Sequence, residues 1–216
     1  MPRRDSDLTT CYVGVSFYRT TDGGELHTAV AQVFNERGDG ASSAAAPRQS
    51  PRLTSGLTWP RPTPASCSAT PSQFSPAEVA GFQGAADERE IDFLELIWIQ
   101  RRGAPHLFRK GQLPPLRGTS VQLDPNALLL YTRGSIPYFR TYPGMYVPQP
   151  LLRPAGDGTD LQAVGADVMA LSKMNWNNAQ LDERDPLTLR TARQVGAILR
   201  HVPPDAQIAT RYAYYI

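Results

Sequence analysis

The fold is decided first by the apolar stretch Cys11-Tyr12-Val13-Gly14-Val15-Ser16-Phe17-Tyr18, which is rich in β-branched and aromatic residues. A turn at Asp22-Gly23-Gly24 follows, and residues 26–34 form a second run of the same kind. Two such runs around an Asp-Gly turn predict a β-hairpin. We therefore expect a tail over residues 1–10 and a first hairpin within residues 11–40.

The composition changes abruptly over residues 41–73, where Ser, Ala, Pro, Thr and Arg dominate and no acidic residue occurs. This stretch has no periodic apolar pattern, so it predicts no regular secondary structure. Two interpretations stay open. The segment is either a disordered linker or the product of a shifted reading frame that replaced part of the original domain. Resequencing that finds an intact frame would contradict the second interpretation.

Regular structure is predicted again from residue 74 onward. Ser75-Pro76-Ala77-Glu78 combines an N-cap, a first-turn proline and a capping box, so a helix should begin there. The apolar run at residues 91–100 predicts a buried central strand. Between the Pro and Gly turns that follow, we expect shorter strands at residues 107–109, 119–123, 127–133 and 145–152.

Two amphipathic helices are predicted near the end of the chain. The first starts at about Asp160, and its apolar stripe consists of Leu161, Val164, Val168 and Leu171. The second has Asp185 as N-cap and Pro186 as first residue, and its stripe consists of Ala192, Val195, Leu199 and Val202. Strands first and helices last, around one core, predict a single mixed α/β domain.

Composition and charge narrow the possible functions. The formal net charge of +2 does not by itself indicate a nucleic-acid binder. Lys110 and Lys173 are the only lysines among 22 basic residues, and arginine suits bidentate phosphate contacts. A GC-rich genome would favour arginine equally, so this alternative stays open.

Other kinds of site find little support in the sequence. Cys11 and Cys67 match neither a disulfide framework nor a zinc site, and the three histidines share no ligand or triad spacing. The N-terminus has no signal-peptide pattern and no apolar run could span a bilayer, so we expect a cytoplasmic protein with no membrane partner.

A resemblance to a known family is carried by the segment Ser172-Lys173-Met174-Asn175-Trp176-Asn177-Asn178. Together with residues 185–190 and 193–196, it resembles the C-terminal signature of prokaryotic Argonaute PIWI domains. Residues 12–18, 31–38, 117–119 and 131–134 resemble the same family. The resemblance covers about residues 11–40 and 74–216. It implies an α/β, RNase H-like PIWI domain with a mixed sheet flanked by helices, partly incomplete and of the short or catalytically inactive type.

The resemblance also bears on catalysis. Active members of the family cleave a target strand with two metal ions held by mostly acidic residues. The position of the first of these carboxylates reads Gly14-Val15-Ser16, and Ser16 cannot supply a charged ligand. The fourth position aligns approximately with Arg193, a cation that would repel metals. The second and third belong to elements whose place is taken by residues 41–73. The resemblance therefore implies no working nuclease and no catalytic residue. An active metal-dependent guide-directed endonuclease and a truncated non-functional remnant stay open as alternatives.

The function that the resemblance implies is a guide- and target-binding module of a defence system. Its partners would be DNA or RNA strands and an effector protein. The MID domain, which forms most of the guide 5′ pocket in this family, is expected to lie outside this chain. Nucleic-acid-binding residues are expected at Lys173, Asn175, Asn177, Asn178, Arg190, Arg193 and Arg140, because their donors match phosphate oxygens. No firmly bound cofactor or metal is expected, but the terminal carboxylate of Ile216 can help to hold Mg²⁺ at the guide 5′ phosphate. Trp176 is interpreted as a core residue.

Overall fold

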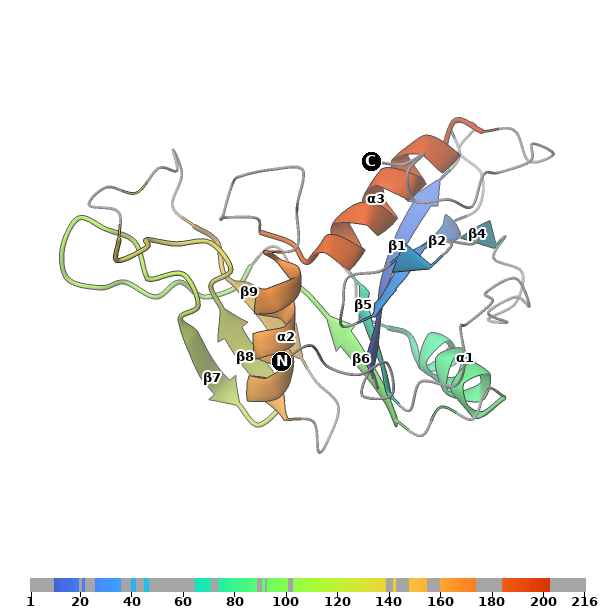
Figure 1. Cartoon of the computed structure of the whole chain (residues 1–216), viewed down its shortest axis with the longest axis horizontal. Coiled ribbons are helices and arrows are strands. Elements are labelled where there is room, and N and C mark those ends of the chain that lie inside the picture. Colours follow the sequence, from blue (N-terminus) through green and yellow to red (C-terminus); the bar gives the residue numbers. More distant parts are fainter. Residues whose placement is uncertain are drawn as a thin grey trace, which may run out of the picture. The chain divides into compact units, whose positions relative to one another are not determined.

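The structure is a computed structural model that describes residues 10–19, 21, 26–35, 40–41, 45–46, 65–70, 74–88, 91, 93–100, 103–138, 142, 148–154, 160–173 and 184–202. The chain divides into two compact units (Figure 1). The first unit combines Met1–Leu96 with Thr188–Ile216, and the second is Ile97–Leu187.

The first unit is built on the predicted hairpin. Strand β1 (Thr10–Arg19) pairs with β2 (Leu26–Asn35) in antiparallel register, so the hairpin is confirmed. Its turn residues 22–25 lie outside the described residues. Val13, Val15 and Ser16 are all buried, and they alternate between the two faces of β1. Both faces are therefore covered, as expected for a strand inside a sheet.

The sheet of this unit is mixed. Its strand order is β3-β2-β1-β5-β6, and β4 also pairs with β2. The further strands are β3 (Gly40–Ala41), β4 (Ala45–Ala46), β5 (Ala65–Thr70) and β6 (Phe93–Trp98). β5 runs parallel to β1, whereas β2 runs antiparallel to it. The predicted α/β class with a mixed sheet is confirmed.

Two expectations about this sheet are wrong. The described residues of the range 41–73 lie in β5, in β4 and at the end of β3, although their composition predicted no regular structure. β5 consists of small residues without an apolar alternation, and its backbone pairs with the edge of β1, so tertiary context decides its conformation. β6 stands at the end of the described strand order and is not central. An apolar run predicts burial, and Ile97 and Ile99 are indeed only 1% exposed each. It does not predict where in the sheet the strand lies. The reading-frame hypothesis stays a prediction.

Helix α1 (Pro76–Asp87) belongs to the first unit and begins as predicted. The Ser75 amide donates to Glu78 Oε2 at 2.8 Å, and the Glu78 amide donates to Ser75 Oγ at 3.3 Å, so the capping box is confirmed. Phe74 and Phe82 pack edge to face across this start, with ring centroids 5.6 Å apart.

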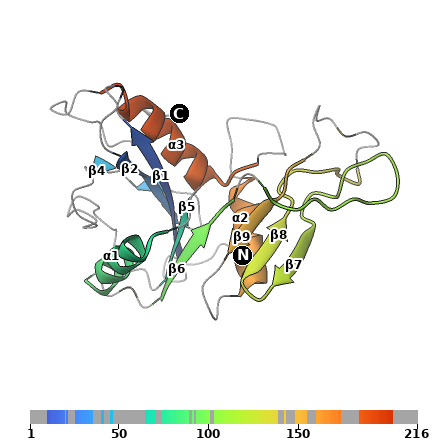
Figure 2. The same ribbon diagram turned by 180° about the vertical axis from the view of Figure 1, so that it is seen from behind.

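Helix α3 (Leu187–Leu199) begins one residue later than predicted and lies along β1 (Figures 1 and 2). Ala192, Val195 and Leu199 of its predicted stripe are buried. Val202 follows the helix and packs against Val195 and Leu199 as a partly buried residue. The amphipathic pattern therefore identified the buried face correctly.

In the second unit, the described residues form an antiparallel sheet covered by a helix (Figure 2). Its strands are β7 (Ser120–Asp124), β8 (Ala127–Leu130) and β9 (Leu151–Pro154), and its helix is α2 (Leu161–Leu171). The predicted stripe of α2 is buried, and Asp160 caps the helix. At Gly165 an added Cβ would lie 2.7 Å from Leu128 Cδ2, so α2 and β8 are in close contact.

The strands expected at residues 107–109 and 145–152 differ from the structure. Residues 107–109 form a loop, because their side chains are exposed and no neighbouring strand pairs with them among the described residues. β9 begins only at Leu151, and residues 143–147 lie outside the described ones. No helix in the described part of the chain combines the length and the apolar character that crossing a bilayer requires.

Candidate nucleic-acid interface

The predicted binding residues fall into three groups. Lys173 is exposed just after α2, in the second unit. Arg190 and Arg193 are half-buried on α3, in the first unit. The others lie outside the described residues, namely Asn175, Asn177, Asn178, Arg140 and Ile216, and so does Trp176. Their roles stay predictions, as does the Mg²⁺ contact of the terminal carboxylate.

The segment that carries Lys173 is held in place by Arg117. The Arg117 guanidinium donates from Nε to the carbonyl oxygen of Thr132 at 2.8 Å and from Nη2 to Ser172 Oγ at 3.1 Å. Ser172 Oγ donates in turn to the carbonyl oxygen of Met169 at 2.7 Å and is only 2% exposed as a residue. One guanidinium therefore ties the end of α2 to the segment that follows β8.

Thr132 extends this hydrogen-bonded group to a third segment. It is fully buried, and its Oγ1 donates to the carbonyl oxygen of Arg184 at 2.6 Å. Thr132 thus brings together three chain segments that each carry basic side chains. We call Arg117, Arg133, Lys173 and Arg184 the basic network.

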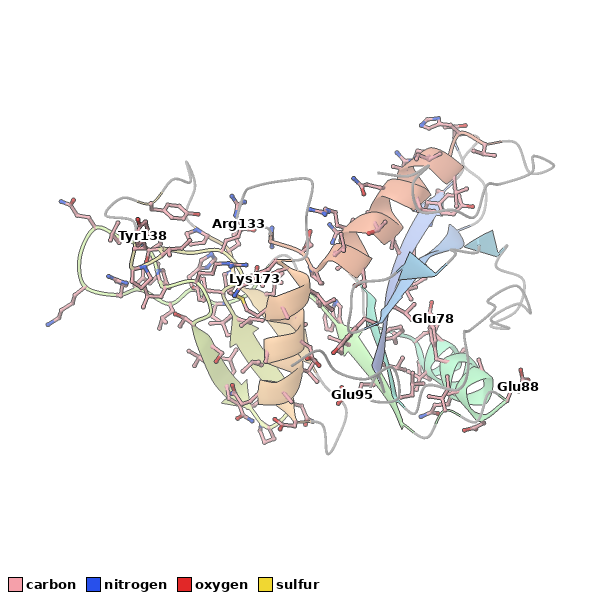
Figure 3. All side chains as sticks on the ribbon, viewed as in Figure 1. Glu78, Glu88, Glu95, Arg133, Tyr138 and Lys173 are labelled. Carbon is pink, nitrogen blue, oxygen red and sulfur yellow. The ribbon has the colours of Figure 1, made fainter. Side chains whose placement is uncertain are left out.

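These contacts join the chain segments that carry the basic network. Arg133 directly follows Thr132, and Lys173 directly follows Ser172. Figure 3 shows Arg133 and Lys173 in the same part of this unit, near the C-terminal end of α2. Asp185, which follows Arg184, is 9% exposed. Asp182 and Glu183 precede Arg184 in the sequence and lie outside the described residues. Among the described residues of these joined segments, four basic side chains accompany one acidic side chain.

The backbone beneath the basic network is well supported. The Arg117 amide donates to the carbonyl oxygen of Ser135 at 2.9 Å, and the Ser135 amide donates to that of Pro115 at 2.9 Å. A Cβ added at Gly134 would meet the carbonyl oxygen of Pro115, so the two segments approach as closely as only glycine permits. Arg117 and Arg133 are therefore attached to backbone segments that are hydrogen-bonded to each other.

Sequence reasoning considered backbone contacts from the loop around Arg133 and Arg140, but it did not assign Arg117 or Arg184 to the interface. Arg117 lies within the segment 117–119 that carried the resemblance, which was the available signal. The role of Arg117 depends on hydrogen bonds across 15 and 55 positions of sequence, and Arg184 is joined to Thr132 across 52 positions, which no local pattern reveals.

The position of the expected first carboxylate lies inside the first unit. Ser16 is 4% exposed on β1, on the same face as Gly14 and Tyr18. An added Cβ at Gly14 would collide with the carbonyl group of Thr188 on α3, and Tyr18 packs against Val195 and Leu199 of the same helix. Ser16 therefore faces α3.

Two neutral groups, the Ser16 hydroxyl and the Tyr18 phenol, lie on the face of β1 that packs against α3. Burial raises the pKa of the Tyr18 phenol, so its neutral form is favoured. Ser16 offers a neutral hydroxyl in place of a carboxylate. Across the described residues, no three His, Cys, Asp or Glu side chains gather in a way that could hold a metal ion. On α3, the Nε and Nη2 atoms of Arg193 are buried, which places cationic atoms inside this helix layer.

Comparison with solved structures identifies this arrangement of strands and helices. No sequence profile of a known family matches the chain, and no curated protein matches it. The Argonaute of A. aeolicus superposes with a TM-score of 0.68 at 18% identity, over 90% of this chain and 29% of that one. The chain has the fold of a segment of a prokaryotic Argonaute.

Two further Argonautes share the fold. The protein of Clostridium butyricum, bound to a guide DNA and a 19-mer target DNA, gives a TM-score of 0.62 at 12% identity over 93% of this chain. That of Marinitoga piezophila, in complex with a 5′ OH guide RNA and target DNA, gives 0.63 at 10% identity over 98% of this chain. The chain spans 28% and 32% of these two proteins. It therefore corresponds to less than a third of an Argonaute.

Proposed function

We propose that this chain is a non-catalytic PIWI module that binds guide and target nucleic acid within a prokaryotic Argonaute defence system and signals through an effector protein. The Argonaute fold supports this proposal, since the Argonautes of C. butyricum and M. piezophila were solved with guide and target strands bound. The observation that carries it is the basic network, in which four basic residues lie on chain segments that are joined by hydrogen bonds.

Phosphate binding would follow from the different roles of the basic residues. Arg117 uses Nε and Nη2 inside the protein, so it acts as a positioning residue. Lys173 is exposed beyond it and can present its ammonium group to a phosphate as a point charge. Asn175, Asn177 and Asn178 follow within the next few residues and would add amide donors to the same strand. On α3, Arg190 and Arg193 would contribute further phosphate contacts.

The proposed absence of cleavage is based on Ser16 and Arg193. A neutral hydroxyl at the first-strand position and a guanidinium on the last helix give two metal ions neither charge nor ligands there. We expect a guide-loaded chain to leave a fully matched target intact in Mg²⁺ or Mn²⁺. Cleavage that disappears with a chelator would contradict the non-catalytic assignment and establish an endonuclease.

Binding itself is tested by titration with a 5′-phosphorylated guide strand over a range of salt concentrations. Removing one phosphate contact should weaken binding and lower the slope of log affinity against log salt by about one. We expect this change for Lys173→Ala and for Arg190→Ala. The matched control is Arg200→Ala, which removes the same charge at an exposed position just after α3.

The outcomes of this titration are distinct. Unchanged affinity and slope in the Lys173 and Arg190 variants, with clear binding by the unaltered chain, would contradict the site assignment. Equal losses in all three variants would show that only net charge matters. Absence of binding by the unaltered chain would overturn the proposed function as a whole.

A further inference from the structure

The loop Gly103–Gly118 of the second unit places large apolar side chains in solvent. Phe108 is 85% exposed and Leu107 is 38% exposed. An aromatic side chain of this size normally contributes to a core, and its exposure retains the unfavourable free energy of hydrating an apolar ring. A single exposed apolar side chain is common on protein surfaces, so the charges beside the ring decide what this loop can contact.

The conformation of this loop is fixed at both ends. Ala104 is buried in a cluster with Leu129 and Tyr131. The Leu107 amide donates to the Tyr131 hydroxyl at 2.7 Å, and Tyr131 is itself only 1% exposed. At its other end the loop is paired with residues 131–135 through the Pro115 and Arg117 backbone. Phe108 therefore lies in solvent directly after Leu107, whose backbone is held by a hydrogen bond to Tyr131.

A tight turn follows Phe108. Gly111 has φ of 108°, a conformation that L side chains rarely adopt. Phe108, Arg109 and Lys110 directly precede this turn, and Figure 1 shows the loop that follows β6 projecting from the second unit.

The charge of the loop selects the chemistry of its partner. Arg109 and Lys110 are exposed and directly follow Phe108, and no acidic residue occurs between Gly103 and Leu123. A purely apolar partner would have to bury or avoid two cations beside the ring. A single-stranded nucleic acid suits both the ring and the cations. Its unstacked bases can stack on an aromatic ring, and its backbone phosphates can pair with the neighbouring basic side chains.

We propose that this loop is a second nucleic-acid contact, a stacking platform for single-stranded DNA or RNA. One base stacks on the ring of Phe108, and the adjoining phosphates pair with Arg109 and Lys110. The inference rests on the proposed nucleic-acid-binding function and adds to it a site separate from Lys173, Arg190 and the other predicted guide-binding residues. Since every base has a flat aromatic face, the contact should depend little on sequence.

The test compares a fluorescent single strand with the duplex of the same sequence, using the whole 216-residue chain. Phe108→Ala and Phe108→Leu should each weaken single-strand binding at least about fivefold, whereas Phe108→Trp should keep it. Duplex binding should change little in all three variants, because paired bases are not available for stacking. Leu123→Ala is the matched control, an apolar side chain that is 44% exposed elsewhere in the same unit.

The charged residues are tested separately. Arg109→Ala with Lys110→Ala should lower the salt-dependence slope for the single strand by about two, one for each phosphate contact. Arg200→Ala serves as the control for a lost surface charge. The far-ultraviolet circular dichroism spectrum of each variant should match that of the unaltered chain, because the substituted side chains are exposed.

Several outcomes would overturn the inference. Single-strand binding that is unchanged in Phe108→Ala removes the platform while leaving the proposed function intact. Binding that is retained by Phe108→Leu but lost in Phe108→Ala indicates an apolar contact without base stacking. If the unaltered chain binds neither strand nor duplex, the proposed function fails and this inference fails with it.

Discussion

At the scale of single residues, Gly14 shows how β1 and α3 depend on each other. A Cβ at this position would collide with the carbonyl group of Thr188 and lie 2.8 Å from the Leu189 nitrogen. Because both obstacles are backbone, a rotamer change cannot relieve the clash. Gly14→Ala should therefore lower the free energy of unfolding by about 1–3 kcal/mol, measured by urea denaturation.

The matched control is Gly84→Ala on α1, where an added Cβ meets nothing within 4 Å. Alanine is the better helix former, so this variant should be more stable by about 0.5–1 kcal/mol. Equal destabilisation of both variants would contradict the close approach of β1 to α3.

Tyr18 predicts a specific alkaline sensitivity. Burial raises its pKa above the usual value of 10.0, so the folded state binds the phenolic proton more tightly than the unfolded state does. Its contribution to stability is complete below the unfolded pKa and is lost as pH rises through the folded pKa. The urea midpoint should therefore fall above pH 10.0, and less steeply in Tyr18→Phe. Identical alkaline slopes in the two proteins would contradict this assignment.

At the scale of elements, α2 depends on its N-terminal cap. Asp160 Oδ1 accepts hydrogen bonds from the amides of Gln162 at 3.0 Å and Ala163 at 3.2 Å. Asp160→Ala removes this acceptor and should cost about 1 kcal/mol, with faster amide exchange at residues 162 and 163. Asp160→Asn keeps an oxygen acceptor and should lose much less. Equal losses in the two variants would indicate that charge, and not the cap, is responsible.

Elements also differ in how much of them could be read from the chain. The capping box at Ser75, the Asp160 cap and the stripes of α2 and α3 are local patterns, and the structure confirms them. The strand predicted at residues 107–109 is wrong. Leu107 and Phe108 are residue types that favour strands, but no strand among the described residues pairs with them. β5 was not predicted because its sequence lacks an apolar pattern. Its backbone pairing with β1 decides its conformation instead.

At the scale of the whole molecule, amide exchange distinguishes a folded module from a non-functional remnant. Amides that bond across distant segments should exchange slowly, among them Tyr131, which donates to Thr119, and Ser135, which donates to Pro115. Amides of β1 and of the β6 strand at residues 93–98 should be protected as well. Uniformly fast exchange across all of these positions would support the remnant.

The sequence by itself determined the local elements, the α/β class and the resemblance to Argonaute PIWI domains, because capping residues, apolar spacing and short motifs are properties of neighbouring residues. Lys173, Arg190 and the residues around them were identified as binding candidates in the same way. Only the tertiary structure decided that Arg117 joins Thr132 to Ser172, that β5 completes the pairing of β1, and that Phe108 stands in solvent on an anchored loop. The physical reason is that each of these depends on a hydrogen bond or an exposed surface created between segments far apart in the chain, and no local pattern encodes such a contact.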